Sequence, residues 1–93
     1  MTRRVRLAVT LGDPRGIGPE IVAAALAAGV DADITLIGAK DQISSIPAAH
    51  HHPTGPWRPD SGPVRASAVE AGLITGRAIE RAAKLALDGE VDA

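Results

Sequence analysis

The residues of this 93-residue chain whose types and spacing could do chemistry lie between Gly12 and Glu20, where nine residues include three glycines and two prolines. Glycine adopts positive φ and lets a ligand approach the backbone closely, and proline holds φ at about −65°. Pro19 suits the first position of a helix, so the segment predicts a turn that presents backbone amides to a ligand at a helix N-terminus. On spacing alone, a purely structural turn fits these residues equally well.

The charged side chains of this segment leave several roles open. Asp13 either stabilises the turn through hydrogen bonds of its own carboxylate, which we favour, or contacts a ligand directly. Arg15 either reaches a phosphate or carboxylate or is simply solvated, and we favour the solvated side chain. The segment is a poor dinucleotide fingerprint, because Ile21 stands where Gly or Ala is wanted. Glu20 would also repel a phosphate placed directly at the helix end.

The surrounding residues predict a β-α-β unit over residues 1–43. Residues 5–11 have apolar side chains at every second position, which is typical of a strand, and residues 34–37 predict a second, buried strand. Between them, residues 19–28 have apolar side chains at helical spacing, and Gly29 is the expected C-cap. The predicted fold class is therefore α/β, an incomplete parallel-sheet unit of the form β-α-β-linker-α.

Two further segments follow. Residues 44–66 hold five of the seven prolines and predict an irregular linker. Residues 67–93 predict an amphipathic helix and the start of a strand. Ser67 is a candidate N-cap, with Glu70 completing a capping box, and the helix is expected to end at Gly89.

Three consecutive histidines, His50-His51-His52, lie in the predicted linker. In an extended segment their side chains alternate in direction, so one metal ion cannot easily use all three. We therefore expect exposed histidines with incidental Ni²⁺ or Zn²⁺ affinity at most, and we assign neither a metal ligand nor a catalytic residue in this chain. Trp57, in the same segment, either covers an apolar edge or lies free in the linker.

The composition excludes several classes of protein. Ten basic and eleven acidic residues give a formal net charge of −1, which argues against nucleic-acid or membrane binding driven by net charge. The absence of cysteine excludes disulfides and thiolate metal sites. The apolar run at residues 5–11 is too short to span a bilayer, so we expect a cytoplasmic protein. Most of the hydrophobic content is alanine, which predicts a thin core and a marginally stable or self-associating chain.

The glycine-rich segment also carries a family resemblance. Residues 12–20 read Gly-Asp-Pro-Arg-Gly-Ile-Gly-Pro-Glu after an N-terminal strand, which resembles the opening of the 4-hydroxythreonine-4-phosphate dehydrogenases. These enzymes belong to the isocitrate and isopropylmalate dehydrogenase superfamily. Residues 67–72, Ser-Ala-Val-Glu-Ala-Gly, together with the helix end at residues 85–93, are similar to the helix that precedes the family's substrate-binding strand. Arg15 departs from the small residue that is usual in the family.

The resemblance implies the N-terminal portion of an NAD-dependent oxidoreductase that also needs a divalent metal ion. Such an enzyme oxidises 4-phosphooxy-L-threonine in pyridoxal phosphate (pyridoxine) biosynthesis, or a related phosphorylated hydroxy acid, and acts as a homodimer. By the same resemblance, the segment lines a cofactor or substrate cleft, and Ile17 packs near the adenosine of the cofactor. The expected cofactor-binding residues are Gly12, Asp13, Gly16, Ile17 and Gly18.

The family's metal-binding histidines and its Thr-Ala-Pro-x-x-Lys strand lie beyond the residues that match. We therefore expect these 93 residues alone to be catalytically inactive. One alternative is a non-enzymatic interaction module that self-associates through an open sheet edge and alanine-rich helices. A weaker alternative is a simple nucleotide-binding β-α-β unit.

Overall fold

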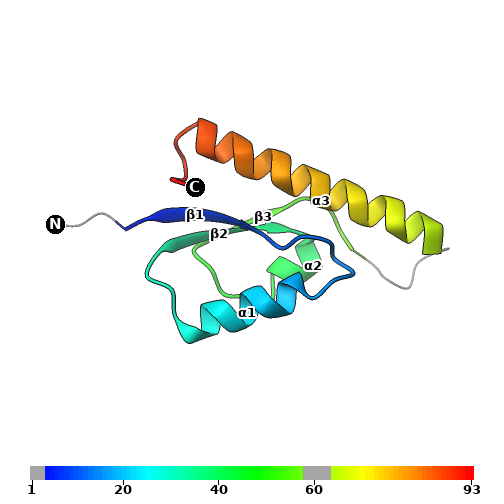
Figure 1. Cartoon of the computed structure of the whole chain (residues 1–93), viewed down its shortest axis with the longest axis horizontal. Coiled ribbons are helices and arrows are strands. Elements are labelled where there is room, and N and C mark those ends of the chain that lie inside the picture. Colours follow the sequence, from blue (N-terminus) through cyan, green and yellow to red (C-terminus); the bar gives the residue numbers. More distant parts are fainter. Residues whose placement is uncertain (1–3, 58–63) are drawn as a thin grey trace.

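The structure, a computed structural model, describes residues 4–57 and 64–93, with side chains in the second range described from residue 68 onwards. These ranges form three strands and three helices, which are, in chain order, β1 (Arg6–Thr10), α1 (Gly18–Ala28), β2 (Asp33–Gly38), α2 (Lys40–Ile43), β3 (His50–Pro53) and α3 (Val64–Leu87). The strands make one parallel sheet in the order β1-β2-β3. Figure 1 shows α1 on one face of this sheet and the long helix α3 on the other. The predicted α/β class is confirmed.

The predicted irregular linker over residues 44–66 is wrong at residues 50–53, which form β3. Backbone pairing explains the difference, because β2 leaves its second edge open and residues 50–53 satisfy it, with His50 opposite Thr35. Pro53 ends the strand, where its missing N–H costs no hydrogen bond within the sheet. The part of the predicted linker at residues 58–63 lies outside the described residues.

The expected helix start at Ser67 is also wrong. Helix α3 begins at Val64, so Ser67 lies within the helix and does not cap it. Arg65 and Ala66 are good helix formers, which favours extension of the helix upstream of Ser67.

The core has one layer on each face of the sheet because successive side chains of a strand point in opposite directions. Ile34 and Leu36 of β2 face α1, whereas Ile37 faces α3. The layer towards α1 consists of Leu11, Ala32, Ile34, Leu36, Ile43 and Ile46. The layer towards α3 includes Ile37, Ala78, Leu85 and Val91.

Trp57 covers an apolar edge, which resolves the alternative left open by the sequence. Its side chain is buried with Ala39, Ala71 and Ile74. Its backbone N–H donates a hydrogen bond of 3.0 Å to the carboxylate of Asp41 at the start of α2. The tryptophan thus joins the end of β3 to the first half of α3.

Helix α1 packs loosely against the sheet. Of the apolar side chains at helical spacing, Val22 and Leu26 contact the core, but Ile21 is 57% exposed and no residue of α1 is fully buried. The helix covers the sheet with alanine, which contributes little apolar area per residue.

Residues 92 and 93 run along the free edge of β1, close to the start of a strand that the sequence predicts there. The N–H of Asp92 donates to the carbonyl of Arg6 at 2.7 Å, and the N–H of Ala8 donates to the carbonyl of Ala93 at 2.7 Å. The Asp92 carboxylate also accepts from the Arg6 N–H at 2.8 Å. Figure 1 shows the C-terminus beside β1.

Within the described ranges no helix has the length and apolar character needed to cross a bilayer.

Candidate functional site: the corner loop after the first strand

The corner loop, residues 12–18, joins the end of β1 to the start of α1, and two of its glycines are required by geometry. Gly12 has φ of 78°, in the left-handed region that a side chain disfavours. A Cβ at Gly18 would overlap with the carbonyl oxygen of Leu11, so the first turn of α1 lies directly against the end of the strand. Glycine therefore makes the sharp turn possible at both ends of the loop.

Asp13 stabilises the turn, as the sequence predicts. Its carboxylate accepts hydrogen bonds from the backbone N–H of Arg15 at 2.8 Å and from the guanidinium of Arg15 at 3.1 and 2.7 Å. These hydrogen bonds lower the pKa of the Asp13 carboxyl below its ordinary value, and the pairing raises the pKa of Arg15. Arg15 is solvent-exposed but ion-paired, so the expectation of a merely solvated side chain is only partly right.

Gln42 of α2 holds the loop from the other side, and sequence analysis missed it. Its side-chain Nε2 donates a hydrogen bond of 2.8 Å to the carbonyl of Pro14, which is buried. The Oε1 atom of Gln42 is also buried and has no hydrogen-bond partner among the described residues. No local signal marks Gln42, because the two residues lie 28 positions apart in the chain.

The structure keeps the five predicted cofactor-binding residues together on this one loop but does not make them equivalent. The N–H of Gly16 donates to the carbonyl of Asp13 at 2.9 Å, so it is not available to a ligand. The N–H groups of Ile17 and Gly18 have no partner among the described residues, as expected in the first turn of a helix. Ile17 is 66% exposed beside them.

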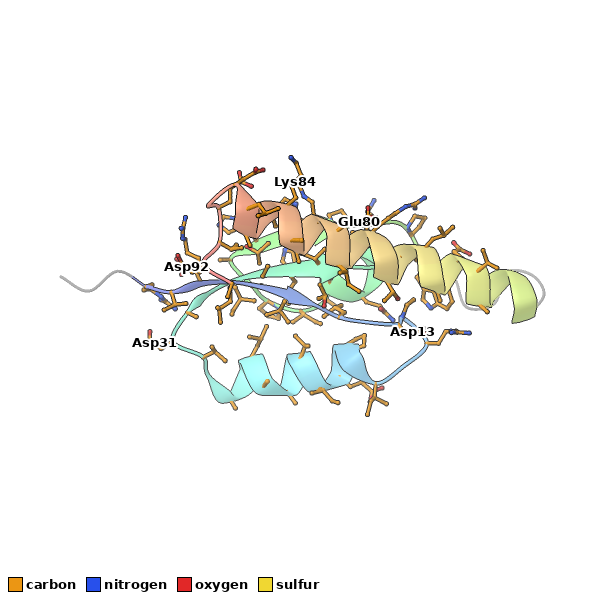
Figure 2. All side chains as sticks on the ribbon, turned by 45° about the horizontal axis from the view of Figure 1, so that its top comes forward. Asp13, Asp31, Glu80, Lys84 and Asp92 are labelled. Carbon is orange, nitrogen blue, oxygen red and sulfur yellow. The ribbon has the colours of Figure 1, made fainter. Side chains whose placement is uncertain are left out.

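The loop lies on an open surface within the described part of the chain. A cavity of about 310 Å³ lies beside it, between α1 and α2, and is lined by residues that include Pro19, Glu20 and Gln42. Figure 2 shows Asp13 near the carboxyl end of β1, at the opposite end of the sheet from Asp92. The carboxyl ends of parallel strands are where α/β proteins bind ligands.

The chemistry that this surface offers is binding rather than bond cleavage. Free space surrounds Gly12, where a Cβ would meet nothing within 4 Å. An exposed Ile17 beside two amides suits a flat apolar group with a polar edge. Glu20 is exposed in the first turn of α1 and disfavours a phosphate at that point.

The three histidines alternate in direction, as predicted. His51 points to one face, where its Nε2 lies 2.7 Å from the carbonyl oxygen of Ile46. His50 and His52 lie on the other face and line a common cavity. His50 and His51 are exposed as expected, but His52 is half-buried. In the residues that the structure describes, no three His, Cys, Asp or Glu side chains are grouped to hold a metal ion.

Comparison of the chain with protein-family models, with curated proteins and with solved structures finds no match.

Proposed function

We propose that this chain supplies the cofactor-side corner of an NAD-dependent dehydrogenase of the 4-hydroxythreonine-4-phosphate type. The substrate would be 4-phosphooxy-L-threonine, as in pyridoxal phosphate synthesis, or a related phosphorylated hydroxy acid, and a divalent metal ion would assist. The observation that carries the proposal is the corner loop, which exposes Ile17 and two unpaired amides at the carboxyl end of a parallel strand.

The described residues fit one part of the dinucleotide better than another. Ile17 and the open space at Gly12 suit packing against the adenosine, whose polar edge the amides of Ile17 and Gly18 would bind. Glu20 argues against placing the pyrophosphate on the start of α1. When bound, NAD would accept the hydride from the substrate, and the residues described here would only orient the cofactor.

A titration with NAD⁺, followed through backbone amide NMR signals, tests the cofactor role. Ile17→Ala and Ile21→Ala form a matched pair, because both side chains are exposed, at 66% and 57%, but only Ile17 belongs to the corner loop. We expect Ile17→Ala to weaken NAD⁺ binding about five-fold, from loss of about 1 kcal/mol of apolar contact, and Ile21→Ala to leave it unchanged. The proposal fails if saturating NAD⁺ leaves the corner-loop amides unshifted.

A second experiment tests catalysis by the chain alone. We expect no NADH formation from the phosphorylated substrate with a divalent metal ion present. NADH formation that EDTA abolishes would place the catalytic groups within these 93 residues and contradict the cofactor-side assignment.

A second candidate function, self-association, is favoured by the outer side of α3. Exposed apolar or small residues follow each other there at helical spacing, and the large ones are Val69, Leu73, Ile79 and Leu87. A homodimer formed through this side would dissociate on Leu73→Glu, which sedimentation at two concentrations would detect. A monomer at both concentrations for the unaltered chain would exclude this candidate.

A further inference from the structure

A polar cavity lies between β3 and α3, on the face of the sheet opposite α1. Helix α3 packs over β1 and β2, so the edge strand β3 is left partly uncovered on this side. The cavity has a volume of about 200 Å³ and a partly apolar lining that includes Leu85. Its polar lining consists of Thr35, His50, His52, Arg81 and Glu90.

The register of the sheet brings three of these side chains to one face. Thr35 of β2 lies opposite His50, and Ile37, which faces α3, lies opposite His52. Thr35 is only 6% exposed, and its hydroxyl has no hydrogen-bond partner among the described residues. This hydroxyl is not among the fully buried atoms without a partner, so its oxygen is accessible from the cavity and can donate a hydrogen bond to a bound acceptor.

Arg81 determines which way the ring of His52 can hydrogen-bond. The Nε of Arg81 lies 3.4 Å from the Nδ1 of His52. Because a guanidinium can only donate, this contact assigns the lone pair to Nδ1 and the ring proton to Nε2. His52 then presents a donor, as the remaining N–H groups of Arg81 do. The same contact disfavours a metal ion on Nε2, because that atom would need its lone pair free.

More cations line the adjoining groove, which shares His52 and Arg81 with the cavity and has a volume of about 330 Å³. Arg77 and Lys84 lie here, spaced with Arg81 along one side of α3. Lys84 is 3.5 Å from the Asp88 carboxylate, whereas Arg77 has no ion pair within the described ranges.

Carboxylates accompany these cations. Glu80 lines the groove, Glu90 lines the cavity and Asp88 pairs with Lys84, so the cationic and anionic side chains are equal in number. Figure 2 shows Glu80 and Lys84 on the side of α3 that faces away from α1. The guanidinium of Arg81, where the cavity and the groove meet, has no ion pair within the described ranges and is therefore the group that favours an anion.

We propose that this cavity binds a phosphate group, either free or carried by a small organic molecule. A tetrahedral phosphate has several acceptor oxygens, and here the donors converge from three elements, Thr35 of β2, His52 of β3 and Arg81 of α3. At roughly 30 Å³ per water molecule, 200 Å³ leaves room for a phosphate with a small organic remainder. The site is separate from the corner loop and does not depend on the proposed dehydrogenase function.

Titrations with inorganic phosphate, glycerol 3-phosphate and acetate at constant ionic strength test this site. The imidazole and amide NMR signals of His50 and His52 report binding. Arg81→Gln is expected to weaken phosphate binding about ten-fold or more, and Arg4→Gln, which removes the same charge away from the cavity, to change it less than about two-fold. Thr35→Val keeps the side-chain shape, removes the unpaired hydroxyl and should weaken binding about five-fold in a chain that stays folded.

Each outcome of these titrations either supports or overturns the phosphate site. Tighter binding of glycerol 3-phosphate than of inorganic phosphate identifies an organic phosphate as the ligand class, and equal binding identifies the free ion; both support the site. Acetate binding as tight as phosphate, no saturable shift at the two histidines, or equal effects of Arg81→Gln and Arg4→Gln would overturn it. Saturation of the histidines by Zn²⁺ with no response to phosphate would also overturn it.

Discussion

Replacement of Gly18 by alanine tests the geometry on which the corner loop depends. The added Cβ would overlap with the carbonyl oxygen of Leu11, which belongs to the backbone and cannot rotate away. Leu11 is itself held in place, because it is 2% exposed and its N–H donates to the carbonyl of Ile37 at 3.1 Å. Either the end of β1 or the start of α1 must therefore move.

The expected loss of stability follows from two opposing terms. Overpacking costs about 1–3 kcal/mol, and the higher helix propensity of alanine returns at most about 1 kcal/mol. The net loss is about 1–2 kcal/mol, which lowers the Tm of a domain of this size by about 4–8 °C for each kcal/mol. Gly76→Ala is the matched control, because Gly76 lies within α3 and a Cβ there meets nothing within 4 Å. It should stabilise the protein by about 0.5–1 kcal/mol.

Urea unfolding followed by far-ultraviolet circular dichroism measures both variants against the unaltered chain. Opposite shifts of the two midpoints, with unchanged slopes, would support the close contact between α1 and the end of β1. Gly18→Ala at or above the stability of the unaltered chain would refute it, because nothing else in the first turn offsets the overlap.

Three further predictions follow from other contacts. Asp13→Asn should lower stability at neutral pH, and because folding lowers the pKa of this carboxyl, the difference from the unaltered chain should fade as pH falls below about 4. A difference in unfolding midpoint that does not depend on pH would count against the ion pair with Arg15. Trp57→Ala should cost about 3–5 kcal/mol in denaturant unfolding, since this side chain is 7% exposed, and a loss under about 1 kcal/mol would contradict its burial. Gln42→Ala removes both the hydrogen bond to Pro14 and a buried unpaired oxygen, so the free energy of unfolding should change by less than about 1 kcal/mol while amide hydrogen exchange in the corner loop accelerates. Unchanged exchange would show that the hydrogen bond from Gln42 to Pro14 does not hold the loop.

Local patterns predicted the first half of the fold well. The apolar alternation at residues 5–11 and the apolar run at residues 34–37 correspond to β1 and β2, and helical spacing between them corresponds to α1. The turn around Asp13 was also predictable, because the interaction spans only two residues. Each of these features depends on neighbours in the chain, which is why sequence reasoning reached them.

Features that depend on distant partners were missed. Strand β3 contains His-His-His-Pro and has no apolar alternation, so its extended form depends on pairing with β2. The bond from Gln42 to Pro14 and the meeting of Thr35, His52 and Arg81 likewise require the folded sheet. The histidines were recognised as unusual, but only the register of β3 decides which of them share a face.

The loose packing of α1 has a consequence for how the molecule opens. With no fully buried side chain, α1 has little to lose on detaching from the sheet, whereas β2 carries the most buried residues of the core. The helix is therefore expected to separate as a partial unfolding unit while the strands stay paired, and protease cleavage should begin within it. A molecule bound between α1 and α2 would contact both helices, so it would favour the attached state of α1 and slow digestion there.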